Sequence, residues 1–314
     1  MTGQGFARTV LGDVPPADLG LTLCHEHLVT APAPRLRDHD DLLLDDEARA
    51  IEELAIFRMA GGGALIDATV AEFGRDVAAL ARISRASGVH VVAATGHVSV
   101  DYWTGVLDIE ARDVEQLVQE MTAEITEGIG TTGIRAGVIK AGSSLDVVTA
   151  AEERVLTAAA RAQRITGAPI TTHTTAGTMA LDQARVLAGA GADPNHVTLG
   201  HLDRRLAYAE HRALARDGFT LGYDCVSKDW YEPDAKRIEM ILRLVDDGLV
   251  GRITLSGDLA RRSSLVAWGG GPGYSYIPWR LVPWLRREGI DEEAIRRITV
   301  DNPARFLTWG ARDA

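Results

Sequence analysis

A chain of 314 residues with 46% hydrophobic, 25% charged and only 5% aromatic residues has the composition of a globular, enzyme-sized protein. Its formal net charge of −11 argues against non-specific nucleic-acid binding, because such binding needs a basic surface to displace counterions from phosphates. Segment 1–12 lacks the apolar core of a signal peptide, and no stretch reaches the roughly 20 apolar residues of a membrane span, so we expect a cytoplasmic protein without a membrane partner.

Short apolar runs rich in β-branched residues recur along the chain and predict strands. They cover residues 21–28, 64–69, 89–95, 134–141, 169–174, 196–202, 219–225 and 253–256. Between them, leucine, isoleucine and alanine recur at spacings of three and four residues, which predicts helices over 46–60, 76–86, 109–127, 151–165, 179–190, 207–216 and 234–247. About eight alternating strand and helix units favour an α/β fold of the closed (β/α)8 type, a TIM barrel, over an open doubly wound sheet.

The same alternation continues without a linker, so we expect residues 1–314 to form a single barrel domain. Segment 1–20 is predicted to be an N-terminal extension or hairpin. The glycine-rich segment 259–278 is predicted to be a loop over the barrel mouth. It lacks the lysine followed by serine or threonine that ends a nucleotide-phosphate loop, which argues against nucleotide binding.

Metal-binding residue types lie at the ends of the predicted strands, where the functional groups of such barrels are found. These residues are His25, His27, Lys140, His173, His201 and Asp258. A single histidine at a strand end is more often a hydrogen-bonded scaffold residue, but chance does not readily explain six such residues together. Imidazole and carboxylate ligands suit zinc and similar ions, and one catalytic zinc needs only about three protein ligands. The sequence therefore predicts two divalent metal ions.

Lys140 can be interpreted in two ways. A buried lysine can lose its proton, and its neutral amine can then take up carbon dioxide to form an anionic carbamate that bridges two cations. Alternatively, Lys140 remains an ammonium group that pairs with Glu26 or Asp258 within the barrel.

Several motifs spread over nearly the whole chain resemble those of the phosphotriesterase-related family of the amidohydrolase superfamily. The resemblance is closest to the phosphotriesterase homology proteins and the phosphotriesterase-like lactonases. It is carried by segments 7–12 (ARTVLG), 19–28 (LGLTLCHEHL), 93–96 (AATG), 171–174 (TTHT), 200–203 (GHLD), 256–258 (SGD) and 301–306 (DNPARF), together with Lys140.

The resemblance implies how the ligands are divided between the metals and what they do. His25, His27 and Asp258 would hold one metal, and His173 and His201 the other, with carboxylated Lys140 and a hydroxide between them. The metals, expected to be Zn²⁺, would lower the pKa of the shared water from about 15.7 towards neutrality. Asp258 would act catalytically by accepting the proton of the attacking hydroxide. Some members place a glutamate near the lysine position, but no acid adjoins Lys140 here. The resemblance also suggests a homodimer.

The expected reaction is hydrolysis of an ester-type bond, and the metal core does not decide whether that bond lies in a lactone, a carboxylic ester or an organophosphate triester. The phosphotriesterases and the phosphotriesterase-like lactonases usually have a large aromatic residue at the second position after the segment that corresponds to Thr95-Gly96. This chain has Val98 there. This departure weakens a direct transfer of either substrate preference.

Basic and aromatic residues near the predicted barrel mouth suggest an anionic small-molecule substrate, such as a phosphorylated sugar lactone. The candidates are Lys228, Arg261, Arg262 and Tyr274. Cations at this place would bind a phosphate or carboxylate, and arginine would bind it through two hydrogen bonds. The alternative is that these cations form structural ion pairs with Asp203, Asp224 or Asp229.

Three other functions compete with a lactonase or esterase: a weak or promiscuous organophosphate triesterase, a metal-binding barrel without catalysis, and an amide hydrolase or deaminase. Retention of Asp258 and the four histidines argues against a non-catalytic barrel. We assign no catalytic role to Cys24, His97, Asp67 or Asp224, and expect the two aspartates to support ligands or the barrel rim.

Overall fold

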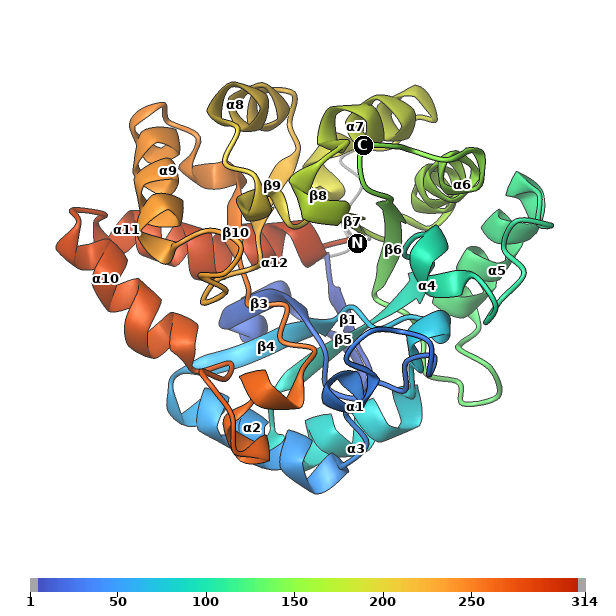
Figure 1. Ribbon diagram of the computed structural model, residues 1–314, viewed down its shortest axis with the longest axis horizontal. Helices are drawn as coiled ribbons and strands as arrows, with labels where there is room; N and C mark the ends of the chain where they lie inside the picture. Colours follow the sequence, from blue (N-terminus) through green and yellow to red (C-terminus); the bar gives the residue numbers. More distant parts are fainter. Residues whose placement is uncertain (1–4, 310–314) are drawn as a thin grey trace.

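The computed structural model describes residues 5–309, which form a ring of parallel strands surrounded by helices (Figure 1). The strands are β3 (Leu21–Glu26), β4 (Gly62–Asp67), β5 (His90–Gly96), β6 (Val138–Ser143), β7 (Ile170–Thr174), β8 (Val197–Leu199), β9 (Thr220–Tyr223) and β10 (Ile253–Leu255). Each strand pairs with the next along the chain. The last strand, β10, also packs against the first, β3, so the sheet is a nearly closed barrel. This confirms the predicted (β/α)8 fold.

Seven long helices follow the strands and cover the outside of the sheet: α2 (Glu47–Met59), α3 (Val77–Ser87), α5 (Val114–Thr126), α6 (Ala150–Thr166), α7 (Ala180–Gly189), α8 (Tyr208–Arg216) and α9 (Asp234–Asp246). Side chains fix several of their N-termini. Asp46 caps α2, while Asp113 and Thr149 form capping boxes with Gln116 and Glu152 at the starts of α5 and α6.

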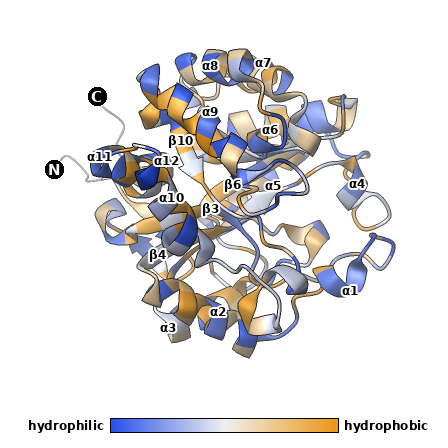
Figure 2. Ribbon diagram, turned by 60° about the vertical axis from the view of Figure 1, so that its left-hand side comes forward, coloured by the Kyte–Doolittle hydropathy of each residue, from blue (hydrophilic) through white to orange (hydrophobic). Residues whose placement is uncertain are grey.

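Shorter helices mark the two ends of the barrel. Helices α1 (His39–Leu42) and α4 (Val100–Trp103) belong to loops that follow strands β3 and β5. Helices α10 (Val282–Arg287), α11 (Glu292–Arg296) and α12 (Asn302–Leu307) come after β10. Figure 2 shows α1 and α4 on one side of the barrel and α11 and α12 on the opposite side. Within residues 5–309, no helix has the length and apolar character needed to cross a membrane.

The N-terminal hairpin closes the end of the barrel that lies away from the predicted metal ligands. Strands β1 (Ala7–Thr9) and β2 (Gly12–Val14) are antiparallel, and the Val10 backbone N–H donates to the carbonyl of Val91 near the start of β5. The buried Arg8 guanidinium lies 4.3 Å from the ring centroid of Trp309 and 5.1 Å from that of Phe6. These contacts hold the two ends of the described chain together beneath the sheet.

Some element boundaries differ from those predicted. Helix α5 begins at Val114 rather than at residue 109, because the Asp113 side chain accepts a hydrogen bond from the Gln116 backbone and caps the helix there. Strand β8 ends at Leu199, and His201 beyond it has a φ of 59° and lies outside the ladder. Helices α10 to α12 were not predicted, since their apolar residues are interrupted by proline and by charged pairs.

Glu26 joins the two strands that close the barrel. Its carboxylate accepts hydrogen bonds from the backbone N–H groups of Gly257 (2.6 Å) and Leu259 (2.8 Å), and lies 2.7 Å from the Ser256 hydroxyl. The side chain is completely buried, and this burial raises the pKa of Glu26 to about 7. A single side chain from β3 therefore satisfies backbone N–H groups on both sides of Asp258.

We predict that Glu26→Ala lowers the free energy of unfolding by about 3 kcal/mol, because two buried backbone N–H groups lose their acceptor. The measurement is urea unfolding followed by circular dichroism. The control is Glu115→Ala, which removes an exposed ion pair with Arg161 and should cost less than about 1 kcal/mol. Equal losses in the two variants would contradict the proposed role of Glu26.

Candidate metal centre at the barrel mouth

The six residues predicted as metal ligands line one cavity of about 310 Å³ at the C-terminal ends of the strands. They are His25 from β3, His27 directly after it, Lys140 from β6, His173 from β7, His201 after β8 and Asp258 after β10. Parallel strands end at the same rim of a barrel, which explains why residues up to 233 positions apart in sequence meet there (258 − 25).

Two of these residues have unusual backbone conformations that turn their side chains inwards. His201 has a φ of 59° and Asp258 a φ of 48°, both in the left-handed region. The His201 backbone N–H donates to Asp224 at 2.7 Å, and the Asp258 backbone N–H donates to the His25 carbonyl at 3.1 Å. These hydrogen bonds hold backbone that would otherwise be unfavourable for residues other than glycine.

His173 and His201 point unprotonated nitrogens at each other. The Asp224 carboxylate lies 2.7 Å from His201 Nδ1, so this nitrogen carries a proton, and in the neutral ring Nε2 is bare. The Thr175 hydroxyl donates to the Ser143 carbonyl and accepts from His173 Nε2, which leaves His173 Nδ1 bare. The two bare nitrogens are 2.9 Å apart. Two lone pairs at this distance repel each other unless a cation lies between or beside them, so the pair fits a metal ion.

The other ligands show the same pattern. His25 Nδ1 faces Asp224 at 3.2 Å, and its Nε2 lies 2.7 Å from Lys140 Nζ. His27 Nδ1 is hydrogen-bonded to Thr69, and its Nε2 lies 3.3 Å from Asp258. The Nε2 atom of His25 therefore faces an amine, and the Nε2 atom of His27 faces a carboxylate. This donor set, two imidazoles and a carboxylate, also fits a divalent metal ion.

Burial favours the neutral, metal-binding form of three of the nitrogen ligands, His25, His173 and Lys140. It lowers the pKa of His25 to about 3 and the pKa of His173 well below its usual value. It also lowers the pKa of Lys140 from the ordinary 10.5 to about 8, so the neutral amine of this side chain is far more accessible near neutral pH than that of an exposed lysine. Glu26 and Asp258 were the partners predicted for a charged Lys140, but its Nζ forms its hydrogen-bond contact with His25 Nε2 instead.

Lys228 forms an ion pair with Asp258. The Nζ of Lys228 lies 2.6 Å from Asp258 Oδ2, while Asp258 Oδ1 faces His27. Burial alone would raise the pKa of Asp258, but the Lys228 ammonium and the neighbouring histidines lower it well below the usual value. Asp258 is therefore ionised at neutral pH, as both a metal ligand and a proton acceptor must be.

Of the other three predicted substrate-binding residues, Arg261 lines the cavity, whereas Arg262 and Tyr274 contact neighbouring loops. Arg261 lines the cavity and pairs with Asp38 (3.1 Å) and Asp41 (3.6 Å). Arg262 pairs with Asp45 at 2.7 Å and donates to the Leu43 carbonyl, so it fastens the loop after β10 to the loop after β3. Tyr274 is buried behind the ligands, where its hydroxyl donates to the His27 carbonyl at 2.6 Å. Neither Arg262 nor Tyr274 forms part of the cavity wall that the structure describes.

Among the cavity-wall residues that sequence reasoning missed are Tyr102, Arg204 and Tyr231. Tyr102 lies in α4, and its ring contacts His173 edge-on with centroids 5.8 Å apart. It provides the aromatic surface that Val98 lacks, from four residues further along the chain. A search for any aromatic residue within one helical turn of Val98 would have found Tyr102.

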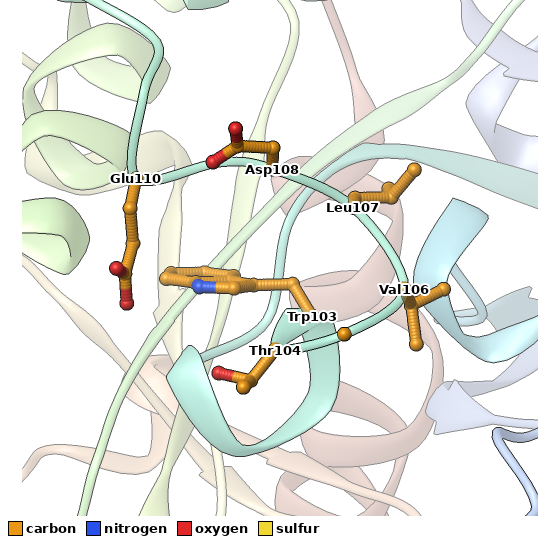
Figure 3. A pocket seen from close by; sticks show the side chains of 7 residues that line it. Trp103, Thr104, Val106, Leu107, Asp108 and Glu110 are labelled. Carbon is orange, nitrogen blue, oxygen red and sulfur yellow. The ribbon is translucent and has the colours of Figure 1, made fainter.

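The residue after Tyr102 faces a different space. Trp103 is buried against a cavity of about 330 Å³, formed by the loop 103–110 (Figure 3). The Trp103 ring contacts His97 edge-on with centroids 6.4 Å apart. Helix α4 thus separates the metal cavity from this second cavity.

His97 is enclosed by two carboxylates beneath the metal cavity. Its Nδ1 lies 3.1 Å from Glu72, and its Nε2 lies 3.6 Å from Glu120. Burial alone would lower the pKa of His97, but the carboxylates of Glu120 and Glu72 raise it to about 9. The residue is therefore a structural imidazolium rather than a substrate contact.

We predict that stability declines as pH rises because His97 loses its proton. The native pKa of about 9 exceeds the ordinary value of 6.5, so the stabilisation is complete below pH 6.5 and is lost as pH rises through 9. The free energy of unfolding of the wild type, minus that of His97→Gln, should fall by about 1–3 kcal/mol over this interval. A difference that stays constant from pH 6 to about 9.5 would show that His97 is not the titrating group.

Comparison with known proteins places the chain among hydrolases. A model of the "Phosphotriesterase family" matches residues 6–307. The "Phosphotriesterase homology protein" of Escherichia coli (strain K12) is 35% identical, over 92% of this chain and 98% of that protein. The "Phospho-furanose lactonase" of Mycoplasmopsis synoviae (strain 53) is 34% identical, over 97% and 92%. The "N-acetyltaurine hydrolase" of Tetraodon nigroviridis is 32% identical, over 98% and 99%.

Solved structures agree with these relatives. The crystal structure of the lactonase Lmo2620 from Listeria monocytogenes has a TM-score of 0.93 and 35% identity, covering 97% of this chain and 99% of that chain. The match confirms the family resemblance seen in the motifs. It also confirms the prediction of a hydrolase that acts on ester bonds.

Proposed function

The chain belongs to the phosphotriesterase family, and we propose that it is a two-metal hydrolase that opens lactone rings or cleaves carboxylic esters, with phosphorylated sugar lactones as its preferred substrates. The observation that carries this proposal is the 2.9 Å approach of the His201 Nε2 and His173 Nδ1 atoms, in the same cavity as the donor set of His25, His27 and Asp258. Four histidines and an aspartate in one cavity exceed the roughly three protein ligands that one catalytic zinc needs, which favours two ions over one.

We assign His25, His27 and Asp258 to one Zn²⁺ ion and His173 and His201 to the other. Lys140 would lie between the two sets as a carbamate, since burial favours its neutral amine and since an ammonium would be repelled by two cations. When bound, the ions would polarise the substrate carbonyl and lower the pKa of an attacking water towards neutrality.

The chain's own side chains prepare the site for this reaction. Asp224 orients the rings of His25 and His201 through their Nδ1 atoms, so that both Nε2 atoms face the cavity. Asp258 accepts the proton of the attacking water through its carboxylate, which the Lys228 ammonium keeps ionised and in place. Tyr102 and Phe73 supply an apolar wall, with ring centroids 5.7 Å apart, against which a sugar ring or acyl chain can lie.

The charge of the cavity wall favours an anionic substrate. Besides the ligand residues, the wall carries the cations Arg37, Arg204, Lys228 and Arg261, while Asp101 is its remaining acid. Lys228, Arg37 and Arg261 lie beside Asp258, Asp38 and Asp41, so the positive charge that would attract an anion comes mainly from Arg204. The lactonase relative named for phospho-furanose substrates is consistent with a phosphate on the substrate.

Amide hydrolysis is the second candidate. The relative named as an N-acetyltaurine hydrolase favours it, because an N-acetylated amine would be cleaved at an amide bond. The two reactions place the same demands on the metals and on Asp258 but differ in the leaving group. Organophosphate triester hydrolysis requires a neutral substrate, which the cationic wall disfavours.

We predict that the purified, Zn²⁺-loaded protein contains about two metal ions per chain and hydrolyses a phosphorylated sugar lactone with a higher kcat/KM than the other substrates. The panel comprises that lactone, its unphosphorylated analogue, a carboxylic ester, an N-acetylated amine and an organophosphate triester. Chelation should abolish activity, and Zn²⁺ should restore it. A metal content below about one ion per chain would contradict the two-metal site.

Asp258→Asn should lower kcat by about 100-fold or more on every active substrate, because an amide cannot accept the proton. Asp182→Asn, which alters an exposed carboxylate paired with Arg185, serves as the control and should retain wild-type kcat. Full activity of Asp258→Asn with bound metal would show that another group takes the proton.

A further inference from the structure

A further cavity, called the basal cavity here, lies at the end of the barrel opposite to the metal ligands. It has a volume of about 330 Å³ and is formed by three segments: the N-terminal hairpin 8–13, helix α3 and the loop 132–135 that leads to β6. The hairpin is attached to the start of β5, so the barrel itself separates this cavity from the metal centre. Pockets that hold small molecules have volumes of about 300–1,000 Å³, so the basal cavity has room for a small ligand.

Three arginines and one acid line the basal cavity. The arginines are Arg8, Arg85 and Arg135, and Asp13 is the only acid among the lining residues. The wall therefore carries an excess of two positive charges, although the formal net charge of the protein is −11. A local excess of positive charge attracts anions.

The three arginines differ in how far they are neutralised. Arg8 donates from Nε and Nη2 to the two oxygens of Asp13, at 2.7 and 3.0 Å, and from Nη1 to the Ile125 carbonyl at 2.9 Å. Arg135 Nη2 lies 3.8 Å from Asp13, which is longer than a hydrogen bond. Within residues 5–309, the side chain of Arg85 forms neither a hydrogen bond nor an ion pair. Arg8 is thus a structural residue, whereas Arg85 and Arg135 have donors available for a ligand.

Tight turns fix the shape of the cavity wall. The Thr9 hydroxyl donates to the Gly12 carbonyl at 2.8 Å, and the Thr132 hydroxyl donates to the Ile129 carbonyl at 2.7 Å, so both hydroxyls are used within their own turns. Gly133 has a φ of 69°, and its backbone N–H donates to no acceptor in the part of the chain that the structure describes. The donors that remain for a ligand are therefore two guanidinium groups and a backbone N–H.

We propose that the basal cavity binds a phosphate group, either free or as a small phosphate monoester, through Arg85 and Arg135. A doubly charged phosphate matches the two excess positive charges, and each guanidinium can donate two hydrogen bonds to its oxygens. A single carboxylate would leave one of the two charges without a partner. The proposal does not depend on the proposed hydrolase function, because it concerns the other end of the barrel.

A bound phosphate would join parts of the fold that are distant in sequence. Arg85 lies in the last turn of α3, and Arg135 lies in the connection from α5 to β6. The Arg8–Asp13 pair belongs to the hairpin between them. A ligand that binds only the folded state raises the stability of that state, so phosphate should raise the temperature of thermal unfolding.

Chemical modification of arginine tests the site residue by residue. The Zn²⁺-loaded protein is treated with phenylglyoxal, and the rate of modification of each arginine is measured by peptide mass spectrometry. Inorganic phosphate at about ten times its dissociation constant should slow the modification of Arg85 and Arg135 roughly tenfold, because only the unliganded fraction reacts. Arg287, an exposed arginine of α10, is the internal control and should react at an unchanged rate. Sodium chloride of equal ionic strength should protect none of the three.

Calorimetry on variants separates this site from phosphate binding at the metal centre. Wild type, Arg85→Met, Arg135→Met and the control Arg287→Met, all loaded with Zn²⁺, are titrated with inorganic phosphate and with glycerol 3-phosphate. Each cavity variant should weaken the binding of the better of these two probes about tenfold or more, and the control should bind it as the wild type does. Tighter binding of glycerol 3-phosphate would support a monoester as the ligand, and tighter binding of inorganic phosphate would support the free ion.

Two results would overturn the proposal. Phosphate bound only at the metal centre would keep the same affinity in wild type, Arg85→Met and Arg135→Met. Protection of Arg85 by sodium chloride equal to that by phosphate would show general screening of charge rather than a binding site. Both readouts are independent of catalysis, so a failure of the hydrolase proposal would leave them unchanged.

Discussion

The carboxylate of Asp224 is the contact on which the geometry of the site depends. One oxygen accepts from both the backbone and Nδ1 of His201, at 2.7 Å each, and the other faces His25 Nδ1 at 3.2 Å. Burial alone would raise its pKa, but His201 and His25 lower it well below the usual value, so the carboxylate is an acceptor at all physiological pH values. One buried anion therefore holds the proton on Nδ1 of His201 and faces Nδ1 of His25, so that the Nε2 atoms of both rings are turned towards the metal cavity.

Asp224 is itself held by the next layer of charged residues. Asp203 accepts from the backbone N–H of Asp224 and pairs with Arg237, which is completely buried and also binds Asp234 at 2.9 Å. These charges are costly to bury singly, and they are stable only because each is paired and hydrogen-bonded. Through these hydrogen bonds and ion pairs, helix α9 and the turn 202–204 hold Asp224 in place, and Asp224 in turn orients the rings of His25 and His201.

The alternation of strands and helices, and the ligand positions at strand ends, could be predicted from the sequence because both follow from simple spacing. Period-two alternation through β3 and the residue after it predicts that His25 and His27 lie on one face, and the family motifs identify the rest. Arg204 and Tyr102 could not be predicted in this way. Arg204 comes three residues after His201, whose positive φ no strand or helix period anticipates, and Tyr102 depends on a four-residue helix inside a loop.

The roles of Arg262 and Tyr274 could not be read from the sequence for a related reason. Both follow Asp258 closely, and residues near a ligand in sequence are natural candidates for the cavity wall. The loop after β10, however, turns back on the loop after β3, where Arg262 meets Asp45 and Tyr274 meets the His27 carbonyl. Their contacts are long-range in sequence, so charge and aromatic character alone did not reveal that they support the loops.

The cations around the cavity divide into those that hold the protein together and one that remains available. Arg262 and Arg261 join loops, and Lys228 holds the carboxylate of Asp258 through the oxygen that does not face His27. Each of these positive charges is largely cancelled by an acid on the same chain, so none of them adds much attraction for a substrate anion. Arg204 differs because its partner is an aromatic ring, which orients the guanidinium without neutralising it. An aromatic partner thus preserves the positive potential of the cavity, while acidic partners provide its rigidity.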